Sequence, residues 1–508
     1  MLLRSSIEKS TMKNNLLFIL LIVAVALAGH LIAYEMFHIP KQIGFVVIFV
    51  VFLFYPVVRF PLVGVYAVFI VSPFIPFVRR LFYLVHGRPG TDPLIVLSDV
   101  LIIMIFLGLF FEFREHPSEQ SDTKKFTRIV SIYFFYMILR AFVFNIATFA
   151  EGLQRLKYYA PAVLLFFIGI YFGRDFKLLK RLWLLTIVVG IAGCVYGLKQ
   201  LFIGYSAAEK LWFATTYFST LFIKGVARPF SFFQAPAAFA DYLVISIIGV
   251  LMFLYWGRFK GKIFIMLLVP LFFYGILITS VRSNWIGALS VFFIWFVVLQ
   301  IRNNTHRIII IAIAFLCFFM YQFFDDSLKA DLKPEALLTV LNGKLGNQEY
   351  VDLMVTSRTG ALTNPFEENS MLSRIALWKY LFLLTEDPQM AIFGRGVGAL
   401  NADSLYVTYL AEFGYPGLIF IVFLLCALVI KGFKALGSLS DPRTVILTKG
   451  IIAFDLAFAL MSFTGTHIHT FPGDVYLWFW NGVLMNVQLL DKKLIEENEN
   501  TVNIGLPA

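Results

Sequence analysis

Residues 404–430 read SLYVTYLAEFGYPGLIFIVFLLCALVI, and this run contains a single charged residue, Glu412. A helix that crosses a bilayer needs about 20 predominantly apolar residues, so the run is long enough to cross one. The strands of an outer-membrane barrel alternate between lipid-facing and lumen-facing residues, whereas this run is apolar almost throughout. The stretch therefore predicts a transmembrane helix.

The rest of the chain has the same character. Of its 508 residues, 60% are apolar and 14% are charged, whereas soluble domains have about 45–50% and about 25%. Further apolar runs of the required length cover residues 16–34, 43–58, 61–78, 93–113, 129–147, 158–173, 182–204, 237–256, 263–281, 284–300, 308–324, 444–464 and 474–490. We therefore expect an all-α polytopic membrane protein with about 14 transmembrane helices.

Proline interrupts two of these segments, at Pro56, Pro61, Pro73 and Pro76. Proline lacks a backbone N–H and disturbs a helix. One of the segments 43–58 and 61–78 is therefore expected to be broken or re-entrant.

The chain divides into four parts. Residues 1–324 hold eleven predicted transmembrane helices, 325–402 form a long loop, 403–490 hold three more helices, and 491–508 form a polar tail with a disordered end. The amphipathic pattern over 372–384 indicates that the long loop is a partly helical cap over the membrane domain.

Basic residues indicate the orientation of the chain. Of the 42 lysines and arginines, 23 fall on the side shared by the two termini, and 12 fall on the other side outside the long loop. Basic residues in short loops favour the cytoplasmic side, so the long loop is predicted to be external. The net charge of +11 is then a topology signal, and it does not require a nucleic-acid partner.

Several arginines are predicted to lie outside against this bias. They are Arg79, Arg80 and Arg88 in one loop, Arg228, Arg282, and Arg358, Arg374 and Arg395 in the long loop. A guanidinium group offers five donors that match phosphate oxygens, so together they suit an anionic lipid-linked pyrophosphate. For any single arginine, snorkelling or a surface ion pair is the alternative.

Other polar residues are candidates for proton transfer or substrate binding. Asp241 lies within an apolar segment, where a carboxylate is either functional or paired with a polar neighbour. His467 and His469 are candidates for acid–base work. Two histidines with Asp474 nearby do not make a zinc site, so neither a metal nor a cofactor is expected. Residues 394–398, GRGVG, are interpreted as a turn because no strand precedes them.

Four stretches together resemble the O-antigen ligase and polymerase superfamily over about residues 180–490. They are RPFSFFQAP at 228–236, LITSVRSNW at 277–285, SRIALW at 373–378 with Pro388 and GRGVG after it, and DSLYVTYLAEFGYPG at 403–417. The resemblance lies in the ordered set and in the late position of the large loop.

The resemblance implies a membrane glycosyltransferase of the bacterial inner membrane, with its site facing the periplasm. Such an enzyme takes a glycan from undecaprenyl pyrophosphate, and its acceptor is a sugar hydroxyl on lipid A core or on another lipid-linked repeat unit. Arg228 and Arg282 would bind the pyrophosphate, with Arg374 as a third contact and Arg88 as a further substrate-binding residue.

The last motif departs from the ligases of that family. Many of them carry His-Asn where this chain has Asp403-Ser404, so the polymerase and ligase interpretations both stay open. Asp403 would be the general base, or else the N-cap of a helix that begins at Ser404.

A transporter or flippase for a lipid-linked glycan is the alternative function. It would share the external arginines. It predicts neither a cap concentrated in one late loop nor the lack of internal repeat symmetry.

Overall fold

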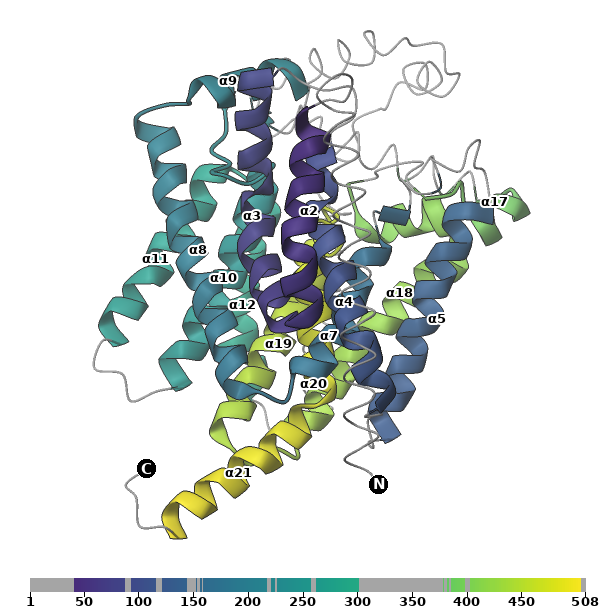
Figure 1. Ribbon diagram of the computed structural model, residues 1–508, viewed down its shortest axis with the longest axis vertical. Helices are drawn as coiled ribbons and strands as arrows, with labels where there is room; N and C mark the ends of the chain where they lie inside the picture. Colours follow the sequence, from purple (N-terminus) through teal and green to yellow (C-terminus); the bar gives the residue numbers. More distant parts are fainter. Residues whose placement is uncertain are drawn as a thin grey trace, which may run out of the picture.

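The computed structural model of the protein is a bundle of helices (Figure 1). It describes residues 41–86, 93–115, 121–143, 152, 156–157, 159–216, 221–223, 226–256, 262–300, 378, 382, 385–397 and 403–503.

The helices follow the apolar segments. In chain order the long ones are α2 (Lys41–Arg59), α3 (Pro61–His86), α4 (Leu97–Glu115), α5 (Ser121–Val143), α7 (Ala160–Phe172), α8 (Phe176–Phe202), α10 (Pro236–Trp256), α11 (Lys262–Thr279), α12 (Arg282–Phe296), α18 (Leu405–Leu436), α19 (Pro442–Met461), α20 (Gly473–Met485) and α21 (Val487–Asn503). Shorter elements are η1 (Pro93–Val96), α9 (Ala207–Thr216), the strands β1 (Phe222–Ile223) and β2 (Val226–Ala227), η3 (Val298–Gln300) and α17 (Pro388–Phe393).

Within the described residues, seven helices are long and apolar enough to cross a membrane, namely α3, α8, α10, α11, α12 together with η3, α18 and α19. The prediction of an all-α, multi-pass membrane protein is thus confirmed. The strands in the described part of the chain, β1 and β2, have two residues each and pair as an antiparallel hairpin. The predicted segments 16–34 and 308–324 lie outside the described residues.

Two predictions from composition are wrong. α2 and α3 are both continuous, although α3 contains Pro73 and Pro76, so neither is broken or re-entrant. Neighbouring helices can satisfy the carbonyls that a proline leaves free, which explains why membrane helices tolerate it. The polar tail is also helical as far as Asn503. Buried Asp491 on α21 accepts hydrogen bonds from the backbone N–H groups of Ser440 and Asp441, which docks this helix on the turn before α19.

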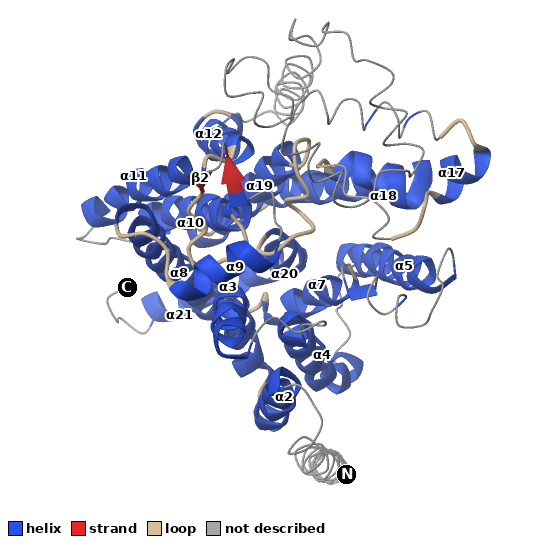
Figure 2. Ribbon diagram, turned by 90° about the horizontal axis from the view of Figure 1, so that it is seen from above, coloured by secondary structure: helices blue, strands red, loops and turns tan. Residues whose placement is uncertain are grey.

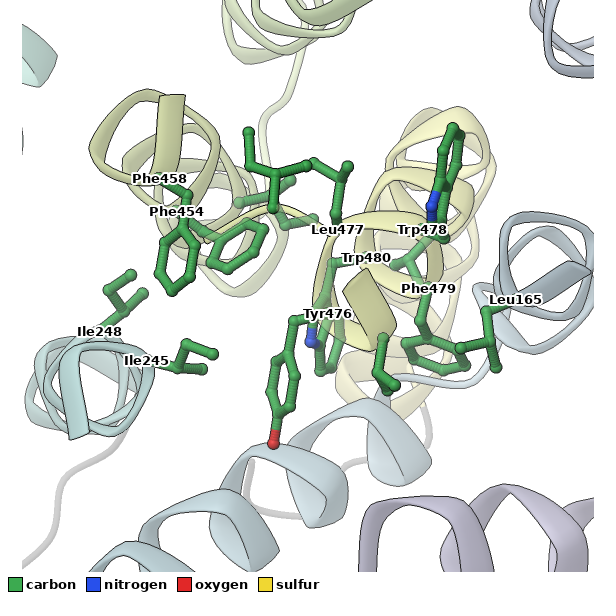
Figure 3. Packing of buried hydrophobic residues seen from close by; sticks show 14 of the residues in the cluster. Leu165, Ile245, Ile248, Phe454, Phe458, Tyr476, Leu477, Trp478, Phe479 and Trp480 are labelled. Atoms are coloured by element: carbon green, nitrogen blue, oxygen red, sulfur yellow. The ribbon is translucent and has the colours of Figure 1, made fainter. Parts of the chain in front are cut away.

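The core is centred on α20, which Figure 2 shows between α7 and α19. Trp480 of α20 stacks on Trp183 of α8 with ring centroids 4.6 Å apart. Figure 3 shows Ile245 and Ile248 of α10 beside Phe454 and Phe458 of α19. Large buried rings such as these supply most of the apolar area that holds helices together.

α7 and α20 approach each other more closely than side chains would allow. An ideal Cβ on Gly169 would lie 2.1 Å from the carbonyl oxygen of Phe479, and one on Gly482 would lie 2.0 Å from that of Phe166. Two glycines that face each other therefore let the two backbones touch, as small residues do in membrane helix pairs.

The helix ends define one face of the bundle, called here the upper face because it lies toward the top of Figure 1 with α9. At this face α8, α11 and α19 end, and α10, α12, α18 and α20 begin. The segments between these helix ends carry most of the candidate site residues that the structure describes.

Candidate functional site

Arg228 lies directly after the β-hairpin at the upper face. Its backbone N–H donates to the carbonyl of Leu221 at 2.9 Å, which continues the pairing of the two strands. Its Nη1 donates to the carbonyls of Thr279 and Ser280, at 3.4 Å each. Thr279 ends α11, and Ser280 begins the turn that leads into α12 at Arg282. The structure therefore brings Arg228 against the turn that carries Arg282, which is exposed at the first position of α12.

The start of α12 adds to the positive charge of this region. The helix has 15 residues, and its N-cap, Val281, makes no side-chain capping bond. The first N–H groups of a helix carry a partial positive charge that favours anions. This partial charge and the guanidinium of Arg282 both lie at the same turn, which suits a phosphate group.

The segment that presents Arg228 is held by buried polar side chains. Arg80 donates from Nη1 to the carbonyl of Phe233 at 2.7 Å and from Nη2 to that of Ser231 at 3.1 Å. The amide oxygen of Gln200 accepts from the N–H groups of Phe230 and Ser231, at 2.9 and 2.7 Å. These bonds fix the backbone of residues 230–233 next to Arg228.

The prediction that Arg79 and Arg80 lie in an external loop is wrong. Both are on α3 and are buried, with 7% and 1% of their surface exposed. The helix continues past the apolar segment because Arg80 finds backbone carbonyls to bind and lies 4.8 Å over the ring of Phe230. Arg80 therefore positions the chain, and sequence reasoning missed this role.

A buried carboxylate links α10, α12 and the loop between α19 and α20. Asp241, 1% exposed, accepts through Oδ1 from Nδ2 of Asn284 at 2.5 Å. The same oxygen lies 2.8 Å from Nδ1 of His467. Asn284 comes two residues after Arg282, so this polar group and the arginines share the beginning of α12. Of the two alternatives for Asp241, pairing with polar neighbours is present, and its neighbours are themselves candidate site residues.

Backbone strain occurs in three of the stretches described in the sequence analysis, residues 228–236, 277–285 and 403–417. Among the described residues outside glycine, the positive φ angles are 56° at Ser231, 54° at Ser280 and 49° at Asp403. Each residue lies in a different one of the stretches 228–236, 277–285 and 403–417. Such conformations cost about 1–3 kcal/mol each and cluster at functional sites. This strain supports the choice of these stretches independently of any resemblance.

Asp403 is exposed and precedes α18. The N-cap of that helix is Ser404, so the interpretation of Asp403 as the N-cap is wrong. The N–H of Leu405 donates to the carbonyls of Ser462 and Gly465, at 2.9 and 3.1 Å. These bonds place Asp403 beside the loop that carries His467.

His469 belongs to a separate aromatic cluster. Its ring stacks on Tyr409 with centroids 5.0 Å apart and meets Tyr159 edge-on at 4.8 Å. The Tyr159 hydroxyl donates to Oε2 of Glu412 at 2.5 Å. Sequence reasoning missed Glu412 and Tyr159 as site residues, although Glu412 is the single charged residue of its apolar run. The two histidines thus have different partners, and within the described chain no group of three His, Cys, Asp or Glu residues could hold a metal ion.

We expect His469 to make the protein acid-sensitive. Burial lowers the pKa of His469 to about 3, so below pH 6.5 the unfolded chain takes up a proton that the folded protein does not. The stabilisation is complete above pH 6.5 and is lost as the pH falls toward 3. Between pH 7 and pH 5 the loss is about 2 kcal/mol. His469→Gln should reduce the fall in detergent melting temperature over this range, and an unchanged fall would contradict the assignment.

The end of the long loop docks on an interruption in α18. Gly414 has a φ of 70°, and Pro416 has no N–H to offer the carbonyl of Glu412. That carbonyl instead accepts from the N–H of Gly396 at 3.1 Å and from Nη2 of Arg140 at 2.9 Å. Residues 394–397 are a turn, as interpreted from the sequence.

The remaining candidates, Arg88, Arg358 and Arg374, and most of the predicted helix over 372–384, lie outside the described residues. No protein-family model matches the chain, and no curated protein is significantly similar to it.

The arrangement combines two chemical capacities. Arg228 and Arg282 offer guanidinium groups to an anion at the beginning of α12. His467, in contact with a carboxylate, offers a group that can exchange a proton. Transfer of a group to a hydroxyl requires a site that binds the anionic leaving group and a proton acceptor close to it.

Proposed function

We propose that the protein is an integral-membrane glycosyltransferase that moves a glycan from undecaprenyl pyrophosphate to a sugar hydroxyl. It would act in the assembly of a bacterial surface polysaccharide, as an O-antigen or exopolysaccharide polymerase or as a ligase to lipid A core. The observation that carries the proposal is the contact of Arg228 with the turn that leads to Arg282. The resemblance noted above in residues 228–236, 277–285 and 403–417 agrees with it.

The chemistry of the leaving group explains the two arginines. When the bond between the sugar and the pyrophosphate breaks, negative charge develops on the departing phosphate oxygen. Preorganised donors at this position stabilise the charge more in the transition state than in the ground state. Arg228 and Arg282 would provide them, with the partial charge of α12 and with Arg374 as a third contact.

The proposed topology follows from the sequence. The chain would cross the inner membrane about 14 times, with both termini in the cytoplasm and the upper face in the periplasm. The external loop, residues 325–402, would cover the site and exclude water, which limits hydrolysis of the donor. The undecaprenyl chain of the donor would lie in the surrounding membrane lipid.

A transfer reaction in detergent tests the proposal against the transporter alternative. The donor is the undecaprenyl-pyrophosphate-linked glycan that accumulates in a strain from which the gene is deleted. Purified protein in micelles has no sealed compartment, so a transporter cannot produce a new glycosidic bond there. We expect glycan transfer with release of undecaprenyl pyrophosphate. If the protein instead only moves the lipid between the leaflets of liposomes, the proposal is wrong.

The surface glycans of the same deletion strain separate the two forms of the enzyme. A polymerase defect should leave single repeat units on the carrier or on lipid A core. A ligase defect should leave long chains on the carrier. Electrophoresis of the extracted glycans distinguishes these patterns.

A further inference from the structure

We propose that His467, oriented by Asp241 and Asn284, is the base that takes the proton from the acceptor hydroxyl. The inference rests on the proposed function, because it assigns one step of that reaction. It makes His467 the catalytic residue of this step and makes Asp241 and Asn284 positioning residues.

The hydrogen bonds around Asp241 determine which nitrogen of His467 can act. An ionised carboxylate only accepts hydrogen bonds. Asp241 Oδ1 accepts from the amide of Asn284, and Nδ1 of His467 lies 2.8 Å from the same oxygen. Nδ1 must therefore carry the hydrogen. In the neutral ring this leaves the lone pair on Nε2, which is the tautomer a general base needs.

The other nitrogen, Nε2, has no hydrogen-bond partner among the described residues. The side chains of His467 and Asp241 are only 5% and 1% exposed. A buried polar atom without a partner costs free energy, and in native proteins it calls for an explanation. A substrate hydroxyl that donates to Nε2 during the reaction supplies one.

Gly465 leaves no side chain against Nε2. An ideal Cβ at this position would lie 2.4 Å from Nε2 of His467, inside van der Waals contact. Any other residue would therefore push the ring away or cover the nitrogen. The N–H of Leu405 holds the carbonyl of Gly465 at 3.1 Å, which fixes this part of the loop.

The position of His467 suits a base that works opposite a pyrophosphate site. Asn284, which bonds Asp241, is on the first turn of α12, two residues after Arg282. Arg228 contacts the turn just before that residue. The base is therefore linked through Asp241 and Asn284 to the helix end that carries Arg282, which is the arrangement that a base acting on a donor held by the arginines needs.

The proposed step joins the acceptor to the sugar and releases the carrier. The acceptor oxygen forms a bond to the anomeric carbon, and the bond from that carbon to the pyrophosphate oxygen breaks. The hydroxyl proton moves to Nε2 of His467, and the bonding electrons leave with undecaprenyl pyrophosphate. The resulting imidazolium lies next to the Asp241 carboxylate, which stabilises its charge. The proton then returns to solvent.

The other proton-transfer candidates are less suited. The low pKa of His469, about 3 because of its burial, makes it a weak base. Asp403 is exposed, whereas His467 is buried and oriented by Asp241.

The test compares His467→Ala and Asp241→Asn with the native protein in detergent. Binding is measured with undecaprenyl pyrophosphate as the probe, and transfer is measured with the lipid-linked glycan from the deletion strain. We expect both variants to bind the probe with nearly native affinity, whereas kcat falls by about 10²–10⁴. The KM for the donor should stay nearly unchanged. Asn at 241 can still offer one oxygen to both Asn284 and Nδ1 of His467, but it lacks the negative charge that stabilises the imidazolium formed when Nε2 takes the proton.

The double variant and a matched control complete the test. Since the pair acts as a unit, Asp241→Asn together with His467→Ala should be no slower than His467→Ala alone. The control is Asp455→Asn, the same change in another buried carboxylate that accepts from an asparagine, Asn481 Nδ2, at 2.8 Å. It should keep native kcat. If Asp241→Asn does not fold, His467→Gln replaces it, because its amide can still donate to Asp241 and cannot take a proton.

The outcomes separate this inference from the proposed function. A native protein that neither binds undecaprenyl pyrophosphate nor transfers glycan overturns both. Native transfer with kcat retained within about tenfold in His467→Ala, less than a general base contributes, overturns the assignment of the base alone. If both variants lose donor binding as well as kcat, the assignment of the base is also wrong, because the two residues would then hold the substrate.

Discussion

Replacement of Arg228 or Arg282 with alanine is expected to lower the rate of glycan transfer by about 10²–10³ without lowering the amount of folded protein. Each change removes one guanidinium from the proposed pyrophosphate site. The affinity for undecaprenyl pyrophosphate should fall as well, because the arginines contact the donor in both the ground state and the transition state. Transfer in detergent and binding of undecaprenyl pyrophosphate are the measurements.

Charge and position can be distinguished by two further variants. Lysine at 228 keeps the charge but lacks the planar fork, so it should recover only part of the activity. Arg174→Ala is the control, since Arg174 is an exposed arginine in the turn between α7 and α8, away from the upper face. It should transfer glycan at the native rate. Full activity of Arg228→Ala and Arg282→Ala would mean that the anion binds elsewhere.

The second large effect is on stability. Gly482→Ala would place a methyl group 2.0 Å from the Phe166 carbonyl oxygen, and Gly169→Ala one 2.1 Å from that of Phe479. Both neighbours are backbone atoms, so α7 and α20 must move apart and lose the contacts of a well-packed core. We expect each variant to lose about 3 kcal/mol or more of stability, which is the upper range for overpacking.

Melting in detergent measures the effect, with Gly437→Ala as the control. An ideal Cβ on Gly437 would lie 3.6 Å from its nearest neighbour, an ordinary contact. Its φ of −71° also suits alanine. This variant should melt near the native temperature. Equal melting of Gly482→Ala and the native protein would show that the two helices can separate at little cost.

Much of the fold could be predicted because bilayer helices need long apolar runs. The segments 237–256 and 263–281, for example, match α10 and α11 to within two residues. An apolar run does not predict the end of a helix that extends beyond its apolar part. Arg79 and Arg80 looked like loop residues, although they lie on the last turns of α3 and bind partners far away in sequence.

The candidate site could be predicted in part. Arg228, Arg282 and Asp241 stood out because each is a charged residue in apolar surroundings, and His467 stood out as a histidine that could exchange a proton. The contact between Asp241 and His467 could not be predicted, since 226 residues separate them. Gln200 and Asn284 were missed because a neutral amide gives little signal until its hydrogen bonds are known.

The interruption of α18 at Gly414 bears on how this protein can be engineered. The turn at 394–397 completes the hydrogen bonding of that helix. The N–H groups of Arg395 and Gly396 donate to the carbonyls of Ala411 and Glu412 at 2.7 and 3.1 Å. Chimaeras that exchange the long loop with that of another protein should therefore join upstream of Asp387, so that α17 and its docking turn stay with the helix α18 that they complete.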